Sequence, residues 1–256
     1  MEDNRKHIVQ DTYEIYFLEY KHKLGMQIWG DRDTFHELYE LVSECWECAD
    51  DVMTRAEECS YIGVFSYFSY TVRHTFMGDR LVKLDGKPVM GWSDGMLDLF
   101  EEEQERFEVG MEFSWPQMLF IMASWWECLK HKECPARVLP VMREFSENIE
   151  CLLRERSKTQ YSSVEPFIKG AIYAANPYLM QTMEHINVQY LQRSRFGRVP
   201  LTYLADLMVC SAFGTWDYNN YLSTLKKHAR RLGCNIEDLQ EQVDETVYDI
   251  DSLVSR

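Results

Sequence analysis

The chain has 256 residues, of which 46% are hydrophobic and 14% aromatic, so it has enough apolar material for a core and is not an intrinsically disordered chain. Its formal net charge of −15 is the opposite of the positive footprint with which a general nucleic-acid binder neutralises phosphates. The composition therefore predicts an acidic globular protein and disfavours nucleic acid as a partner, although negative charge also suits mimicry of a nucleic acid.

The chain start and the cysteines point to a reducing compartment. The first ten residues, MEDNRKHIVQ, contain no apolar segment of the kind found in a secretory signal. Without such a signal, the eight cysteines are expected to be reduced thiols rather than disulfides. The longest apolar stretch, residues 115–129, is shorter than the ~20 residues that span a bilayer. We therefore expect a cytoplasmic protein with no membrane segment.

Hydrophobic periodicity predicts a mixed first half. Alternation of apolar and polar residues indicates strands, and apolar residues spaced three and four apart indicate helices. The predicted elements are strands over 13–20 and 24–29, helices over 34–49 and about 55–77, and strands over 80–84 and 106–113. Gly78 is placed to end the second helix.

From Ser114 onward, every predicted element is helical. Ser114 is placed to cap a helix that begins with Trp115 and Pro116. The later predicted helices cover 141–157, about 164–193, 200–212, 216–232 and 236–252, with a polar linker over 158–163. Pro177 is expected to kink or end the helix over 164–193. The pattern predicts an α+β fold: a domain over 1–158 with an antiparallel sheet and packed helices, then an all-helical domain over 159–256.

Ionisable residues of both signs crowd the end of the second predicted helix. Arg73, His74, Asp79 and Arg80 surround Gly78. A histidine beside a carboxylate can act as a general base, and two arginines can hold a phosphate or carboxylate. The structural interpretation instead pairs Arg73 with an acid on the first helix and uses Asp79 to hold the turn. Catalysis, recognition of a ligand or partner, and this structural role all stay open.

A basic cluster lies near the end of the chain. Its members are Lys226, Lys227, Arg230 and Arg231. A basic helix followed by a glycine turn and another helix is compatible with a helix-turn-helix fragment. We favour an amphipathic helix whose basic face pairs with acids of the helix predicted over 236–252. The acids available there are Glu237, Asp238, Glu241 and Asp244.

No metal or cofactor site is predicted. The thiols and imidazole that resemble zinc ligands are Cys45, Cys48, Cys128, His131 and Cys134. Cys45 continues an apolar helical stripe, which favours buried inert thiols over a zinc knuckle. The chain also lacks a Walker loop, a Rossmann fingerprint and the common hydrolase motifs, so no residue is assigned a catalytic role.

Three segments in order resemble a known family. They are LGMQIWGDRDTFHELYELV, YIGVFSYFSYTVRHTFMGDR and VGMEFSWPQMLF. Together they resemble a family of short bacterial proteins classed only as a domain of unknown function, in which Gly-Asp ends a strand before a helix, Arg-His precedes Gly-Asp-Arg, and Trp-Pro starts a helix. The matching residues are Gly30, Asp31, Arg73, His74, Gly78, Asp79, Arg80, Trp115 and Pro116.

This resemblance covers about residues 14–130 and brings no established activity. It implies an α+β amino-terminal region, marks the same polar cluster, and leaves residues 160–256 outside as a helical extension. The leading prediction is a non-catalytic binding or regulatory protein that recognises a protein partner, and a homo-oligomer stays open. The alternatives are a hydrolase or phosphoester-binding enzyme that uses His74 and Asp79 with Arg73 or Arg80, and a protein that binds or mimics nucleic acid.

Overall fold

The structure is a computed structural model that describes residues 6–10, 13–19, 23–50, 61–89, 94–129, 136–170, 176–212, 214–236 and 239. Its elements in chain order are β1 (Lys6–Gln10), β2 (Tyr13–Glu19), β3 (Gly25–Gly30), α1 (Arg32–Asp50), α2 (Tyr61–Phe76), β4 (Leu81–Leu84), β5 (Lys87–Pro88), α3 (Asp94–Glu102), the 3-10 turn η2 (Gln104–Arg106), β6 (Phe107–Ser114), α4 (Trp115–Cys128), α5 (Val138–Arg156), α6 (Tyr161–Ile168), α7 (Leu179–Ser194), α8 (Leu201–Val209) and α9 (Trp216–Leu232).

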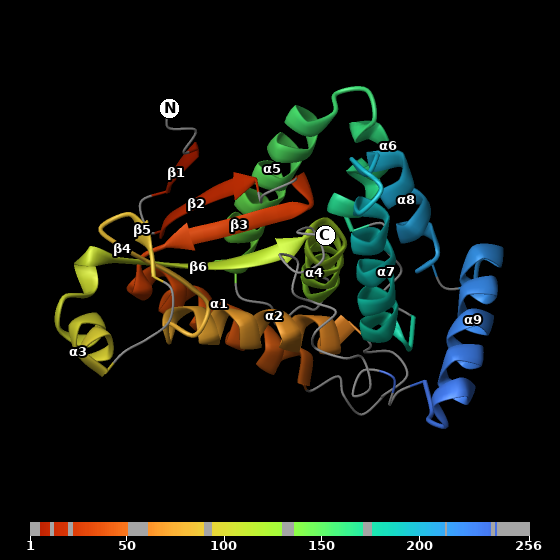
Figure 1. Ribbon diagram of the computed structural model, residues 1–256, viewed down its shortest axis with the longest axis horizontal. Helices are drawn as coiled ribbons and strands as arrows, with labels where there is room; N and C mark the ends of the chain where they lie inside the picture. The colour runs from red at the N-terminus through yellow and green to blue at the C-terminus, as the bar shows by residue number, and fades with distance from the viewer. Residues whose placement is uncertain are drawn as a thin grey trace.

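The strands form one antiparallel sheet in the order β1-β2-β3-β6-β4-β5. At its centre Ile28 of β3 pairs with Met111 of β6, and both side chains are buried on the face that the helices cover. Helices α1, α2 and α4 contact β6 on this face, and the Phe145 ring of α5 meets Phe17 of β2 at 5.1 Å (Figure 1). The α+β prediction, with a helical carboxyl-terminal region, is therefore confirmed.

The opposite face of the sheet carries a layer of aromatic and charged side chains. Trp29 lies there with the Lys83 ammonium 3.6 Å from its ring centroid. The hydroxyl of Tyr16 donates to Glu108 at 2.8 Å and accepts from Lys83 at 3.0 Å. The indole of Trp29 rests against Gly110, where a Cβ would come within 2.6 Å of the ring. A glycine is required at this point because any side chain would displace the tryptophan.

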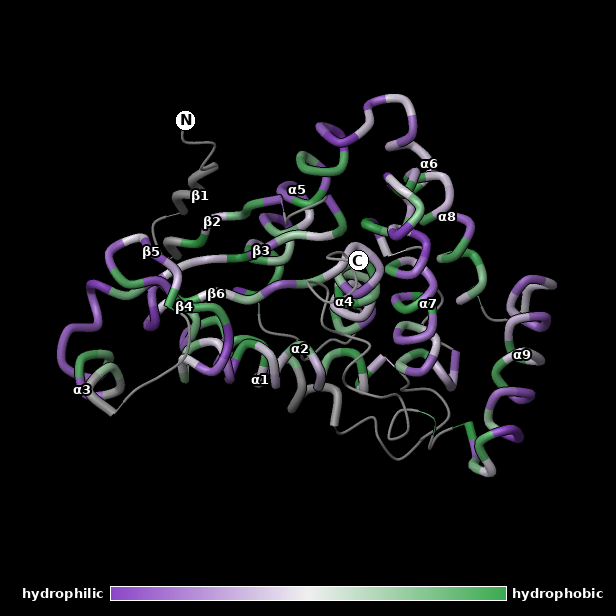
Figure 2. The backbone as a smooth tube through the Cα atoms, in the orientation of Figure 1, coloured by the Kyte–Doolittle hydropathy of each residue, from purple (hydrophilic) through white to green (hydrophobic). Residues whose placement is uncertain are grey.

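Helix α4 is the centre of the hydrophobic core. As predicted, Ser114 caps it: the Ser114 hydroxyl accepts from the Gln117 amide, and the Gln117 side chain accepts from the Ser114 amide. Trp125 of α4 is fully buried, with ring centroids 5.4 Å from Phe68 of α2 and 5.3 Å from Phe145 of α5. Figure 2 shows hydrophobic stretches in α2 and α4 near the centre of the molecule.

One cluster of buried side chains runs from Ile15 to Met208. It joins the sheet and helices α1 to α5 to helices α6, α7 and α8, so apolar packing continues across residue 158. The division into domains 1–158 and 159–256 stays a prediction. A smaller cluster lies beneath α9 and consists of Tyr221, Leu225, Ala229, Ile236 and Leu239.

Two strands were not predicted from the sequence. The first, β1, has the largely polar sequence KHIVQ. The second, β5, is only two residues long and forms a hairpin with β4 through Asp85 and Gly86, whose φ angles are 49° and 74°. Positive φ at both residues is typical of the tight turns that join antiparallel strands, and Asp-Gly is a favoured pair for them.

The helix predicted over 164–193 is wrong as a single element, because the chain forms α6 and α7 there, and the break expected at Pro177 lies in the non-helical residues just before α7. Helix α6 begins at Tyr161, inside the predicted linker, and the chain leaves it at Gly170 with φ of 80°. Before α7, the Asn176 side chain accepts a hydrogen bond of 2.9 Å from the Tyr178 amide. Most of the helix predicted over 236–252 lies outside the described residues, as do residues 55–60 of the second predicted helix. No described helix is long and apolar enough to cross a membrane.

Candidate functional site

Helix α2 ends in a hydrogen-bonded turn at Gly78. Gly78 has φ of 83°, and its amide donates to the Thr75 carbonyl at 3.0 Å. The Asp79 amide donates to the His74 carbonyl at 2.9 Å. These two bonds form a Schellman motif, which satisfies carbonyls that the end of a helix would otherwise leave unpaired. The glycine predicted to end the helix therefore does so.

His74 and Asp79 close this turn with their side chains. His74 Nδ1 lies 2.7 Å from Asp79 Oδ2. A carboxylate only accepts hydrogen bonds, so Nδ1 carries the proton and Asp79 fixes the ring orientation. The pair bridges the two positions of a Schellman motif that commonly make an apolar contact. The other ring nitrogen, Nε2, is enclosed and has no hydrogen-bond partner among the described residues.

Tyr70 and two arginines surround the histidine on the surface. The Tyr70 ring is 51% exposed and lies 4.1 Å from the His74 ring, centroid to centroid. The guanidinium carbons of Arg73 and Arg80 lie 5.8 Å and 6.0 Å from the Tyr70 ring centroid. We call Tyr70, Arg73, His74, Asp79 and Arg80 the α2 cap cluster. The structure thus brings the four predicted residues together around an aromatic ring that the sequence analysis did not single out.

The two arginines of the α2 cap cluster are exposed. Within the described ranges neither guanidinium forms an ion pair, so the expected pairing of Arg73 with the first helix is not found there. Beneath the cluster, burial raises the pKa of Tyr67 to about 12, against an opposing effect of Arg80. The Tyr67 hydroxyl accepts a hydrogen bond of 3.1 Å from the Gln117 side chain. Tyr67 therefore stays protonated at neutral pH and has a structural role.

The predicted basic patch lies on the outer side of α9. Tyr218, Tyr221, Leu225 and Ala229 form the buried stripe of this helix. All four basic residues are exposed: Lys226, Lys227, Arg230 and Arg231. Their expected acidic partners, Glu237, Asp238, Glu241 and Asp244, fall outside the described residues. The favoured pairing of this face with an acidic helix therefore stays a prediction.

Two of the thiols considered as zinc ligands are buried together. Cys45 and Cys128 lie in the core, and the Cys128 thiol donates to the Cys45 carbonyl at 3.3 Å. A thiol that donates in this way is protonated and packed, as expected for an inert core cysteine. Cys48, His131 and Cys134 have no described side chain. Among the side chains that are described, no group of three or more metal-ligating residues exists.

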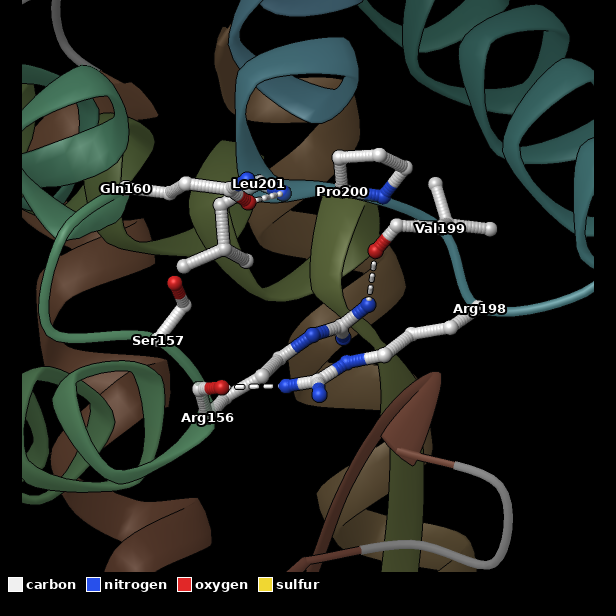
Figure 3. A pocket seen from close by; sticks show the side chains of 7 residues that line it. All are labelled: Arg156, Ser157, Gln160, Arg198, Val199, Pro200 and Leu201. Carbon is white, nitrogen blue, oxygen red and sulfur yellow. Dashed lines mark hydrogen bonds between the residues drawn. The ribbon is translucent and has the colours of Figure 1, made fainter.

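A polar cavity that no sequence pattern predicts lies between the α5–α6 turn and the segment before α8. It encloses about 200 Å³ and is lined by Arg156, Ser157, Gln160, Arg198, Val199, Pro200 and Leu201 (Figure 3). Arg156 and Arg198 are 42 positions apart in the sequence. No sequence motif connects the two arginines, and in the sequence each of them resembles an ordinary surface cation.

A protein family described as a domain of unknown function (DUF6904) matches residues 15–251. The chain belongs to this family. The DUF6904 match continues far beyond residue 130, so the prediction that residues 160–256 lie outside the family is wrong for residues 160–251. No curated protein and no solved structure matches the chain.

Proposed function

We propose that this protein is a non-catalytic binding or regulatory protein whose α2 cap cluster recognises an acidic segment of a partner protein. The observation that carries this proposal is an exposed tyrosine flanked by two exposed arginines without ion pairs among the described residues. On a chain with a net charge of −15, such a patch is a local site for a negatively charged partner.

The composition of the cluster supports recognition of a protein. Tyrosine and arginine are enriched among the residues that dominate binding energy at protein interfaces, and charge pairs across an interface accelerate association. Met77, in the same turn, is 50% exposed and adds apolar surface beside the cations. The contact between His74 and Asp79 holds this turn in one conformation, which lowers the entropy lost when a partner binds.

The same geometry weighs against the hydrolase alternative. A general base must reach the proton that it abstracts, directly or through one water. In His74, Nδ1 is occupied by Asp79 and Nε2 is enclosed beneath its neighbours. Neither nitrogen is presented to a substrate in this arrangement, so the pair is better suited to holding the turn.

The proposal is tested with fluorescent peptides rich in Asp and Glu and with matched peptides that carry Asn and Gln instead. The protein is expected to bind the acidic set, with affinity that falls as salt screens the contact. Arg73→Glu combined with Arg80→Glu should weaken binding at least about tenfold, which corresponds to ~1.4 kcal/mol. Thermal melting shows whether the variant is folded, and Tyr70→Ala provides a second variant without charge reversal.

The matched control reverses two exposed cations on α9, by Lys226→Glu with Arg230→Glu. It makes the same change in net charge at a different surface, so it should leave binding of the acidic peptides nearly unchanged. Equal loss in both double variants would mean that the attraction is non-specific. Unchanged binding in the folded Arg73→Glu/Arg80→Glu variant would refute recognition by the α2 cap cluster.

A second candidate function is binding of a polyanion, including nucleic acid, by the basic face of α9. The exposure of its four basic residues favours this candidate, and the overall negative charge opposes it. Titration with a labelled single strand and a labelled duplex separates the two candidates, because only the α9 double variant should then lose binding. Cytoplasmic location and oligomeric state stay predictions.

A further inference from the structure

The cavity beside the start of α8 lies away from the α2 cap cluster and is not explained by the proposed function. Three segments form it: the end of α5, the turn that leads into α6, and the chain from Arg198 to Leu201 (Figure 3). Two of its lining residues carry permanent positive charge, and none of the lining residues carries a negative charge. A cavity with this charge distribution selects for anions.

Arg156 is a buried cation whose known partners are neutral. The residue is only 5% exposed. Its guanidinium donates to the Tyr190 hydroxyl at 3.0 Å, to the Val199 carbonyl at 2.6 Å and to the Lys23 carbonyl. A buried charge is costly unless an opposite charge compensates it. The carboxylate of Glu19 pairs with the Lys23 ammonium at 3.3 Å, and no ion pair joins it to Arg156 within the described part of the chain.

Arg198 places a second positive charge at the same cavity. One of its terminal nitrogens donates to the main-chain carbonyl of Arg156, so the side chain reaches back to the end of α5 (Figure 3). Its described partner is again a neutral oxygen rather than a carboxylate. Two guanidinium groups that line one cavity repel each other, and an anion between them would relieve this repulsion while accepting hydrogen bonds from those N–H groups that have no partner among the described residues.

The start of α8 adds to this positive potential. Pro200 stands at the N-cap position and offers no side-chain acceptor, and the Gln160 side chain accepts from the Leu201 amide at 3.0 Å. The amino end of a helix carries partial positive charge and favours negatively charged groups. Val199, Pro200 and Leu201 also give the cavity an apolar side.

From these contacts we propose that the cavity binds a small oxyanion, a phosphate or carboxylate group, with Arg156 and Arg198 as its ligands. The buried Arg156 is fixed by three segments and forms the base of the site. The exposed Arg198 contacts the anion from the solvent side. The volume of about 200 Å³ admits the anionic group together with a few attached carbon atoms that would lie against the apolar side.

The test is titration calorimetry of the full chain with sodium phosphate and with sodium acetate, and with sodium chloride at matched ionic strength. Saturable one-site binding of phosphate or of acetate, absent with chloride, is expected, and the tighter ligand identifies the anionic group. Arg198→Gln should weaken this binding at least about tenfold, because it removes a charge-assisted contact. Arg195→Gln makes the same charge change outside the cavity lining and should bind like the wild type.

Arg156→Gln is not the deciding variant, because loss of the three hydrogen bonds that this buried side chain donates is expected to destabilise the fold. The proposal fails if neither oxyanion binds more tightly than chloride. It also fails if folded Arg198→Gln binds the oxyanion as tightly as the wild type, or if Arg195→Gln loses as much affinity as Arg198→Gln.

Discussion

The main core and the small cluster beneath α9 are built on different scales. The main core contains the helix-covered face of the sheet and helices α1 to α8, with large aromatic side chains fully buried at its centre. Among the described residues the cluster beneath α9 has five buried members, and Figure 2 shows hydrophilic stretches along this helix at the edge of the molecule. Burial of apolar area stabilises each region, so α9 should open at a lower free energy than the core.

The largest expected effect comes from emptying the centre of the main core. Trp125→Ala removes a buried indole that contacts Phe65, Phe68 and Phe145, and should cost about 3–5 kcal/mol. Chemical denaturation followed by circular dichroism measures this loss as a lower transition midpoint.

Trp125→Phe is the matched control for this change. The indole N–H of Trp125 is buried and has no hydrogen-bond partner in the described part of the chain, so its removal breaks no described hydrogen bond. Phenylalanine keeps most of the apolar volume and should cost much less than alanine. Equal destabilisation by the two substitutions would show that the packed volume at this position is not what stabilises the core.

A smaller and more local effect is expected beneath α9. Leu225→Ala should cost about 2–4 kcal/mol of local stability, since it leaves a cavity among the buried side chains beneath α9. Hydrogen exchange should therefore accelerate in α9 and stay unchanged in α2. The exposed Thr224→Ala is the neighbouring control. Faster exchange in both helices would make α9 an integral part of the main core.

The smallest expected effect is a dependence of α9 docking on pH. Burial lowers the pKa of His185 of α7, with a further contribution from His228 of α9, and the His185 ring lies 5.3 Å from that of Tyr221. Nε2 of His185 also lies 2.6 Å from the amide nitrogen of Gln189, which can only donate. The His185 ring must therefore be neutral to accept this hydrogen bond.

The sign of this effect follows from the direction of the shift. Because the folded pKa lies below the unfolded value of about 6.5, the contribution of neutral His185 is present above that pH and is lost as the pH falls toward the folded pKa. Exchange in α9, corrected for its intrinsic pH dependence, should accelerate below about pH 6.5. His185→Gln should flatten this response, whereas the exposed His36→Gln should keep it. An unchanged response in His185→Gln would assign the acid sensitivity to another group.

The sequence predicted those parts of the fold whose signals are local. Neighbouring residues determine the end of α2 at Gly78, the cap of α4 at Ser114 and most helix boundaries. They also account for the grouping of Arg73, His74, Asp79 and Arg80. The break at Gly170 was missed because apolar periodicity continues on both sides of it. Strand β5 was missed because two residues show no periodicity.

Features that depend on tertiary packing could not be predicted in the same way. The placement of Arg80 beside Tyr70 depends on the path of the chain after the turn at Gly78, whereas Arg73 lies beside Tyr70 because the two are three residues apart on α2. The cavity unites Arg156 with residues 198–201, which approach only because α7 returns the chain to the end of α5. The sequence does not distinguish a buried arginine from an exposed one, so it could not predict that Arg156 is buried and Arg198 exposed.

The contact between Trp29 and Gly110 has a consequence for how this family can vary. The two residues face each other on β3 and β6, and the space above the glycine is filled by the indole. A larger residue at position 110 is tolerable only if position 29 shrinks at the same time. Among natural variants, the two positions should therefore change together, and a library randomised at both should return mainly complementary pairs of one large and one small residue.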